Sequence, residues 1–235
     1  MIKLKTLIFT GLLIFLLVGL FSCSDEEIIA SADGDAFITV KVEQNDTLYG
    51  LALHGFGNKD FGYVTSTDED NTLYTLDPYN GYSYDYFYET DDEFLSESIS
   101  KIGEYTFAFS FETGETDSDI DILTKDCIYP TTITTCEYDT TEEEINLEWE
   151  INGDADFIVI YLNNENGDTT FISNSIDGST TSYSISSDTE YWGNYTPVNG
   201  EKYTVTIYMY LYETDEEDLN IQCRAENTST VIWGE

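Results

Sequence analysis

Short runs of alternating apolar and polar residues dominate the chain. In the clearest run, residues 104–111, four aromatic side chains alternate with Thr106, Ala108 and Ser110. Period-two alternation is typical of a half-buried β-strand, and no stretch beyond residue 35 keeps a helical period. Further strands are predicted in this part of the chain at residues 38–42, 49–53, 61–66, 72–76, 82–88 and 119–123.

The same pattern continues after residue 127. Strands are predicted to begin at Pro130 and to cover residues 145–151, 157–162, 171–173, 182–186, 200–212 and 219–233. Asn166-Gly167, in the turn after the third of these strands, is a strong hairpin signal. We therefore predict an all-β chain of two consecutive antiparallel β-sandwich domains, residues 36–126 and 127–235.

The second domain resembles a fibronectin type III domain, a member of the immunoglobulin-like sandwiches. The resemblance covers residues 128–234 and depends on Trp149 in the second strand, an aromatic-rich third strand and Gly200-Glu-Lys-Tyr-Thr-Val entering the sixth. It implies that Trp149 fills the core and that Tyr203 ties back to the backbone at a sandwich corner. It also implies a binding or spacer module. The connection at residues 186–199 is longer than that family usually has.

The N-terminus resembles a bacterial lipoprotein signal. Lys3 and Lys5 precede an uncharged, mostly apolar stretch at residues 7–21, and Leu20-Phe21-Ser22 stands directly before Cys23, as in a lipobox. The resemblance implies removal of residues 1–22 and lipid attachment at Cys23. An uncleaved helical anchor ending at Cys23 is the alternative, although the apolar stretch is short for a membrane span.

The residues after Cys23 extend this resemblance. Ser24-Asp25-Glu26-Glu27 is similar to the acidic export tag of surface lipoproteins in glycan-foraging Gram-negative bacteria. It implies a protein of the outer membrane that is exposed at the cell surface and attached to the membrane by its lipid. Residues 23–35 would form an acidic tether.

Charge narrows the range of partners. Lys3 and Lys5 are two of eight basic residues, and all 47 acidic residues lie beyond residue 22, so the mature chain would carry a formal charge of −41. Such a chain repels nucleic acid, so we expect no nucleic-acid partner. Intrinsic disorder, the competing interpretation of high net charge, does not fit 19 tyrosines, 13 phenylalanines and three tryptophans.

The cysteines predict one disulfide in an oxidising compartment. In the topology that the fibronectin resemblance implies, the first and last strands run side by side, and Cys127 and Cys223 lie near their starts. This favours a Cys127–Cys223 bridge with Cys136 left over. A local bridge between Cys127 and Cys136 stays open.

We find no motif for a nucleophile, a phosphate loop or a zinc site, and we predict no enzyme, no cofactor and no metal site. His54 is the sole histidine and is given no role. Two alternatives remain. One is a hydrolase acting through a carboxylate pair. The other is a module stabilised by calcium at the acidic clusters of residues 68–71, 117–121 or 215–218.

Rows of tyrosines are the candidate binding residues. In the strand at residues 203–212, Tyr208, Tyr210 and Tyr212 would point outward, with Val205, Ile207, Met209 and Leu211 inward. Tyr82, Tyr84, Tyr86 and Tyr88 would form a second row. Exposed tyrosines suit a glycan or peptide, although packing against a neighbour explains them too. We predict a non-catalytic surface lipoprotein that binds an extracellular protein or glycan or acts as a spacer.

Overall fold

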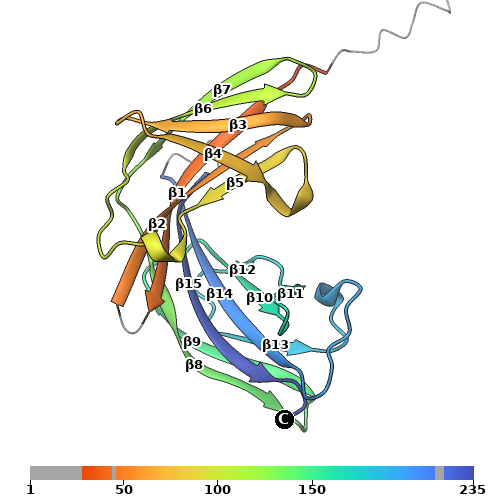
Figure 1. Ribbon diagram of the computed structural model, residues 1–235. Coiled ribbons are helices and arrows are strands. Elements are labelled where there is room, and N and C mark those ends of the chain that lie inside the picture. The colour runs from red at the N-terminus through yellow and green to blue at the C-terminus, as the bar shows by residue number, and fades with distance from the viewer. Residues whose placement is uncertain (1–27, 44–45, 215–219) are drawn as a thin grey trace, which may run out of the picture. The chain divides into compact units, whose positions relative to one another are not determined.

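The computed structural model describes residues 28–43, 46–214 and 220–235. The predicted signal peptide and the lipid attachment at Cys23 lie outside the described residues. Within the described ranges the chain is all-β, as predicted, and its helical segments are single 3₁₀ turns (Figure 1). None of these segments is long and apolar enough to cross a membrane.

Seven strands make up the first half of the molecule. They are β1 Ala32–Glu43, β2 Asp46–Gly57, β3 Phe61–Asp68, β4 Leu73–Pro78, β5 Asp85–Glu89, β6 Gly103–Phe111 and β7 Thr116–Leu123, with the 3₁₀ turns η1 Tyr79–Gly81 and η2 Asp92–Phe94. The second half has β8 Tyr129–Asp139, β9 Glu144–Asn152, β10 Phe157–Asn163, β11 Thr169–Ile172, β12 Ile176–Asp177, β13 Ser182–Ser186, η3 Glu190–Trp192, β14 Lys202–Tyr212 and β15 Ile221–Ile232.

In the first half, strands β1, β2 and β5 face a layer of β4, β3, β6 and β7. The layers join at one corner, where β4 pairs with β5 through only two residues. The aromatic residues of β6 are buried between the layers, which confirms the alternation predicted for residues 104–111. Gly34 lets β1 lie directly on this core, because a Cβ there would stand 2.3 Å from the ring of Phe107.

Aspartate side chains join β7 to the edge of β1. Asp117, Asp119 and Asp121 accept hydrogen bonds from the backbone N–H groups of Ala32, Gly34 and Ala36 at 3.0, 2.9 and 2.6 Å. The second oxygen of each carboxylate accepts from the next amide of β7. The carboxylates of the acidic cluster at residues 117–121 are therefore bonded to backbone amides, and the β1 amides among them would otherwise be unpaired at the edge of the strand.

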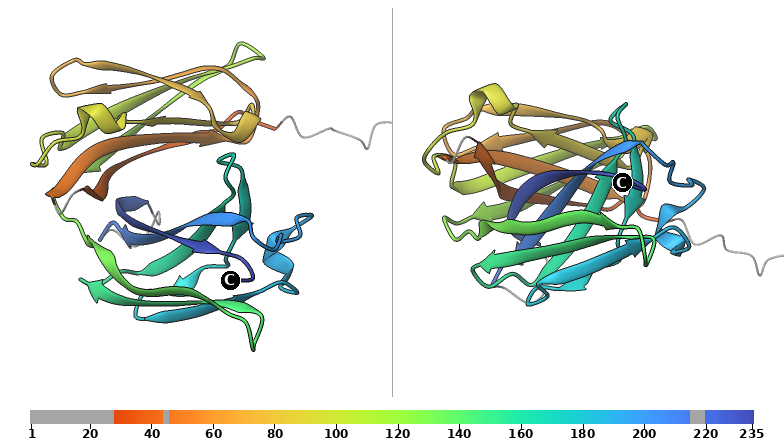
Figure 2. Two further views of the ribbon diagram at one scale, coloured as in Figure 1. Left: turned by 60° about the horizontal axis from the view of Figure 1, so that its bottom comes forward. Right: turned by 90° about the horizontal axis from the view of Figure 1, so that it is seen from below.

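The second half has the two layers of a sandwich, β13-β9-β8 against β11-β10-β14-β15 (Figure 2, left). Trp149 is buried between them, and the Tyr203 hydroxyl accepts a hydrogen bond from the Val198 N–H at 3.2 Å. Both placements confirm what the fibronectin resemblance implies. The long connection at residues 186–199 adds Trp192, which packs against Phe171 and Trp233 and enlarges the core.

A parallel pairing of β1 with β15 connects the halves, with Ile38 opposite Cys223 and Lys41 opposite Glu226. Just beyond this register, the buried Asp35 accepts from the Ile221 N–H at 3.1 Å. Among the described strands, twelve thus form one sheet, and residues 31–235 are one compact unit. The predicted division into domains near residue 127 stays a prediction.

Candidate binding face

One face of the long sheet carries a cluster of aromatic side chains, most of them half-exposed. Residues directly opposite each other in antiparallel strands share a face, and the register places Phe157, Tyr210 and Arg224 in line. We call the following set the aromatic face: Phe157 and Tyr161 of β10, Tyr208, Tyr210 and Tyr212 of β14, Arg224 of β15, Phe37 of β1, His54 and Phe56 of β2, Tyr79 of η1 and Phe87 of β5.

The three candidate tyrosines of β14 lie on this face. Of the residues that were expected inward, Val205, Ile207 and Met209 are buried in the core, which confirms the alternation for them, whereas Leu211 is only half-buried. The tyrosines themselves are half-buried because they pack against β10. Tyr210 stacks on Phe157 with ring centroids 4.4 Å apart, and Tyr208 meets Tyr161 edge-on at 5.1 Å. Ligand binding by Tyr208, Tyr210 and Tyr212 stays a prediction.

Arg224 lies at the centre of the face. Its guanidinium stands 5.2 Å from the ring of Tyr208 and 5.7 Å from that of Phe37, and it donates to Glu89 Oε1 at 2.6 Å. Burial would lower the pKa of Arg224, but the charges of Glu89 and Glu226 outweigh it and raise the pKa above its ordinary value. The guanidinium thus stays charged among aromatic rings.

Lys41 completes this ionic network on the same face. Its Nζ lies 3.6 Å from Glu89, 3.3 Å from Glu226 and 3.1 Å from Asp92. Burial acts to lower its pKa as well, and the neighbouring carboxylates again raise it above the ordinary lysine value. Two basic side chains therefore offset part of the acidic charge where the aromatic side chains gather.

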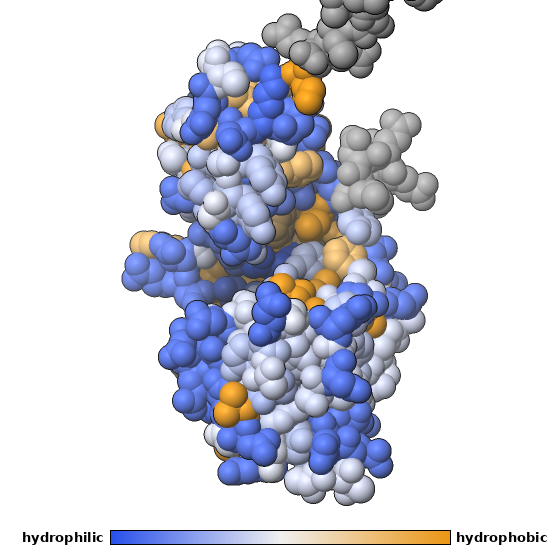
Figure 3. Space-filling view, turned by 90° about the vertical axis from the view of Figure 1, so that its right-hand side faces the viewer, coloured by the Kyte–Doolittle hydropathy of each residue, from blue (hydrophilic) through white to orange (hydrophobic). Residues whose placement is uncertain are grey.

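On the first half, the face is built around His54. Its Nε2 lies 2.7 Å from Asp85 Oδ1, and its ring is 5.2 Å from Phe56 and 6.0 Å from Phe87. Tyr79 and Phe56 are the most exposed rings here, at 41% and 38%. The side of the molecule drawn in Figure 3 is hollowed, and apolar side chains gather along the hollow. His54, for which no role was predicted, thus packs among the rings of the face.

Several members of the face were not predicted from the sequence. Phe157 and Tyr161 could have been found, because with Val159 they alternate along one strand. Phe37, Phe87 and Arg224 carried no signal, since their place depends on the pairing of β1 with β15.

The second predicted tyrosine row, Tyr82 to Tyr88, is wrong. Strand β5 begins only at Asp85, because Asn80 and Gly81 adopt positive φ values of 51° and 78° and turn the chain before it. Tyr86 is buried, and the rings of Tyr82 and Tyr84 lie ahead of the strand in a tilted contact with centroids 5.5 Å apart. These tyrosines therefore do not form one row.

Cys127, Cys136 and Cys223 are free thiols in this structure, and an interaction between Cys127 and Cys223 shifts the pKa values of both. This interaction lowers the pKa of Cys127 to about 7 and, together with burial, raises the pKa of Cys223. The proximity supports the pairing that the sequence favours, and the disulfide itself stays a prediction.

The described residues offer no group of three or more His, Cys, Asp and Glu side chains that could hold a metal ion. In the cluster at residues 68–71, Asp68 accepts from the Asp70 and Thr72 amides and pairs with Lys101. The cluster at residues 215–218 lies outside the described residues.

No protein-family model and no curated protein matches the chain. Solved structures that match include a two-domain fibronectin type III segment from chicken tenascin, with 13% identity, coverage of 85% of this chain and 99% of that one, and a TM-score of 0.31. The FN1–FN3 domains of chicken CNTN1 match with 11% identity, 86% and 65% coverage and a TM-score of 0.30.

A third match is the solved chain of a structure that concerns a 1.5-MDa bacterial ice-binding adhesin, with 13% identity, coverage of 87% of this chain and 65% of that solved chain, and a TM-score of 0.26. Because each of these TM-scores is below 0.5, we infer neither a family nor a ligand from them.

Proposed function

We propose that the protein is a non-catalytic binding module of the bacterial cell surface and that its aromatic face binds an extracellular glycan. The observation that carries this proposal is the band of half-exposed rings on β10 and β14 and on β2, η1 and β5, which Arg224 and the buried ring of Phe37 connect. Aromatic rings offer large, rigid contact areas that lose little entropy on binding. A band of this extent is more than packing of a single strand requires.

Charge selects among glycans. The chain is strongly acidic, with a formal charge of −39, so an anionic polysaccharide would be repelled. Arg224 and Lys41 are already paired with Glu89 and Glu226 and are not available to attract one. A neutral glycan, whose sugar rings stack on aromatic faces, fits the band better.

The position at the cell surface belongs to the same proposal. Cleavage before Cys23 and acylation of its thiol and amine would anchor the chain in the outer membrane, since two or more acyl chains hold a protein durably. The predicted tether of residues 23–35 would then be shorter, because β1 begins at Ala32, and it would present the aromatic face to the outside.

The test is a glycan array with the soluble fragment of residues 24–235. Because Phe56 and Tyr79 are exposed, the Phe56→Ala/Tyr79→Ala variant should keep the fold, and we expect it to bind at least about tenfold more weakly, a loss of about 1.4 kcal/mol. The Tyr208→Ala/Tyr210→Ala variant should lose binding too. Tyr63→Ala is the matched control, because this 49% exposed ring lies on β3 in the other layer.

Each outcome has a clear meaning. Loss of binding in both face variants, with the control unchanged, supports the proposal. Binding that persists in both variants places the glycan site elsewhere. A wild-type fragment that binds no neutral glycan, but binds a protein partner through the same rings, overturns the glycan proposal.

A further inference from the structure

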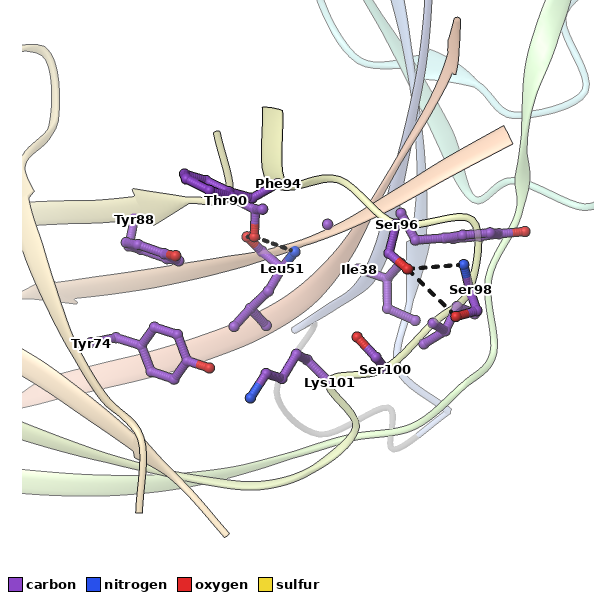
Figure 4. Close-up of a pocket in the computed structure, with 13 residues that line it drawn as sticks. Ile38, Leu51, Tyr74, Tyr88, Thr90, Phe94, Ser96, Ser98, Ser100 and Lys101 are labelled. Atoms are coloured by element: carbon purple, nitrogen blue, oxygen red, sulfur yellow. Dashed lines mark hydrogen bonds between the residues drawn. The ribbon is translucent and has the colours of Figure 1, made fainter. Parts of the chain in front are cut away.

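A cavity of about 200 Å³ opens at one end of the core of the first half, between strand β2 and the connection from β5 to β6 (Figure 4). Ile38 and Leu51 form its base. Their side chains point to the core side of the sheet, because they alternate with residues such as Phe37 of the aromatic face. The cavity is therefore separate from the aromatic face.

Two tyrosines line one wall of the cavity. The rings of Tyr74 and Tyr88 lie 5.3 Å apart, and Figure 4 shows both hydroxyl ends directed toward the side of Lys101. The Tyr74 hydroxyl and Lys101 Nζ each bond to Asp68 Oδ2 at 3.1 Å. Asp68 therefore neutralises Lys101, and the cavity presents aromatic surface and hydroxyl groups without a net positive charge.

Serine hydroxyls line the opposite wall. Ser96 is fixed by two backbone hydrogen bonds with Tyr49, at 2.7 and 3.0 Å, and its hydroxyl bonds to the Ser98 amide at 3.3 Å. Ser98 and Ser100 continue this wall, and Figure 4 shows the Ser100 hydroxyl between Lys101 and Ser96. Hydroxyl groups both donate and accept hydrogen bonds, so the wall can match a ligand rich in hydroxyl groups.

Phe94 stands at the rim of the cavity. It lies on the single turn η2 and is 68% exposed, although a phenylalanine usually buries its ring. An exposed ring beside a cavity can cover a bound ligand, and the ring itself becomes buried when the ligand binds.

We propose that this cavity binds one uncharged pyranose ring at the end of a glycan. Its volume is below the roughly 300–1,000 Å³ of pockets for drug-sized ligands, so it suits a single ring. Apolar C–H faces of a sugar would pack on Tyr88 and Phe94, and its hydroxyls would bond to Ser96 and Ser100. This inference goes beyond the proposed function, because it adds a second site of different geometry on another side of the sheet.

The experiment measures binding of neutral methyl pyranosides to the complete mature chain by saturation-transfer and ¹H–¹⁵N NMR. The probes are the methyl glycosides of glucose, galactose, mannose, fucose and N-acetylglucosamine. We expect at least one to bind with a Kd on the order of 1 mM, as suits a small ligand in an open site. The amides of Leu51 and Ser96 should shift on binding.

Two variants locate the site. Phe94→Ala removes the rim ring and Ser100→Leu blocks the hydroxyl wall, and because both residues are exposed the fold should persist. We expect each to weaken binding at least about tenfold. The matched controls are Tyr82→Ala, an exposed ring outside the cavity, and Ser118→Leu, an exposed serine on β7, and both should bind as the wild type does.

Two results overturn the inference. One is a wild-type protein that binds none of the five probes at millimolar concentration. The other is binding that Phe94→Ala and Ser100→Leu leave unchanged, or that shifts only amides of the aromatic face. Failure here is distinct from failure of the aromatic face, because the Phe56→Ala/Tyr79→Ala variant should keep pyranoside binding whatever it does to polymeric glycans.

Discussion

At the scale of single residues, Asp68 illustrates how local hydrogen bonds override burial. Burial alone would raise the pKa of its carboxyl group, but bonds from the Thr72 amide, Lys101 and Tyr74 lower the pKa to about 2. A carboxylate whose pKa is lower in the folded than in the unfolded protein stabilises the fold above the unfolded value, near 4. This stability is lost as the pH falls through about 2.

Asp68→Asn should therefore lower the free energy of unfolding at pH 7 by on the order of 2 kcal/mol. The difference from the wild type should shrink between pH 4 and pH 2, as measured by urea unfolding at several pH values. The double variant with Lys101→Met separates the ion pair from the amide bonds. A difference that stays constant down to pH 2 would contradict this account.

The sequence predicted some residues well and others not at all. Trp149 and Tyr203 took the places that the fibronectin resemblance implies, because their roles depend on the local pattern of one strand. Asp68 was only one acid in a cluster, since its partner Lys101 is 33 residues away in the chain. The ion-pair partner of a side chain depends on the fold and cannot be predicted from the residues next to it in the sequence.

At the scale of elements, the aspartates of β7 take the place of a strand pairing. Asp119 accepts from the Gly34 amide at 2.9 Å, between two equivalent bonds. Removing it leaves that amide without an acceptor, and a hydrogen bond to a charged group contributes about 1.5–3 kcal/mol. Asp119→Ala should destabilise the protein by about 2 kcal/mol and speed hydrogen exchange at Ala32, Gly34 and Ala36.

Two variants control this prediction. Asp119→Asn keeps an oxygen acceptor and should keep most of the protection of β1. Ser118→Ala changes the neighbouring exposed side chain on the other face of β7 and should have no effect. Unchanged exchange at Gly34 in Asp119→Ala would mean that the aspartates do not hold this edge.

Strand positions followed from alternation, but strand edges did not. Each predicted strand has a counterpart in the structure, because the alternation of apolar and polar residues along a strand shows which side faces the core. The cluster at residues 117–121 suggested calcium, since the sequence does not reveal that these carboxylates face the N–H groups of a strand 85 positions earlier. The hydrogen-bond partners of side chains at a strand edge can be predicted only when the neighbouring strand is known.

At the scale of the whole molecule, Cys127 and Cys223 would bridge the connection between the halves and β15. A bond between them would close a loop of nearly 100 residues and should contribute about 2–4 kcal/mol. Peptide mapping without reduction should recover a Cys127–Cys223 cross-link. Cys136 should be recovered as a free thiol that can be alkylated. Reduction should lower the Tm, and Cys136→Ser should leave it unchanged. A cross-link to Cys136 would restore the local alternative.

The sequence suggested two independent domains because each half has its own run of strands. It gave no sign of the β1–β15 ladder, since pairing between strands about 185 positions apart is decided by how the halves pack rather than by local pattern. We infer from this ladder, and from Arg224 bonding to Glu89 of the first half, that the halves unfold together.

Tryptophan fluorescence can test this inference, because Trp149, Trp192 and Trp233 are the chain's three tryptophans and all lie in the second half. Phe107→Ala hollows the core of the first half and should cost about 3–5 kcal/mol. If the halves are coupled, the urea midpoint reported by tryptophan should fall together with the midpoint from circular dichroism, which reports both halves. Thr106→Ala, an exposed neighbour on β6, should move neither. A tryptophan midpoint that stays in place while the dichroism transition splits would show that each half folds by itself, and that the ladder joins two stable domains.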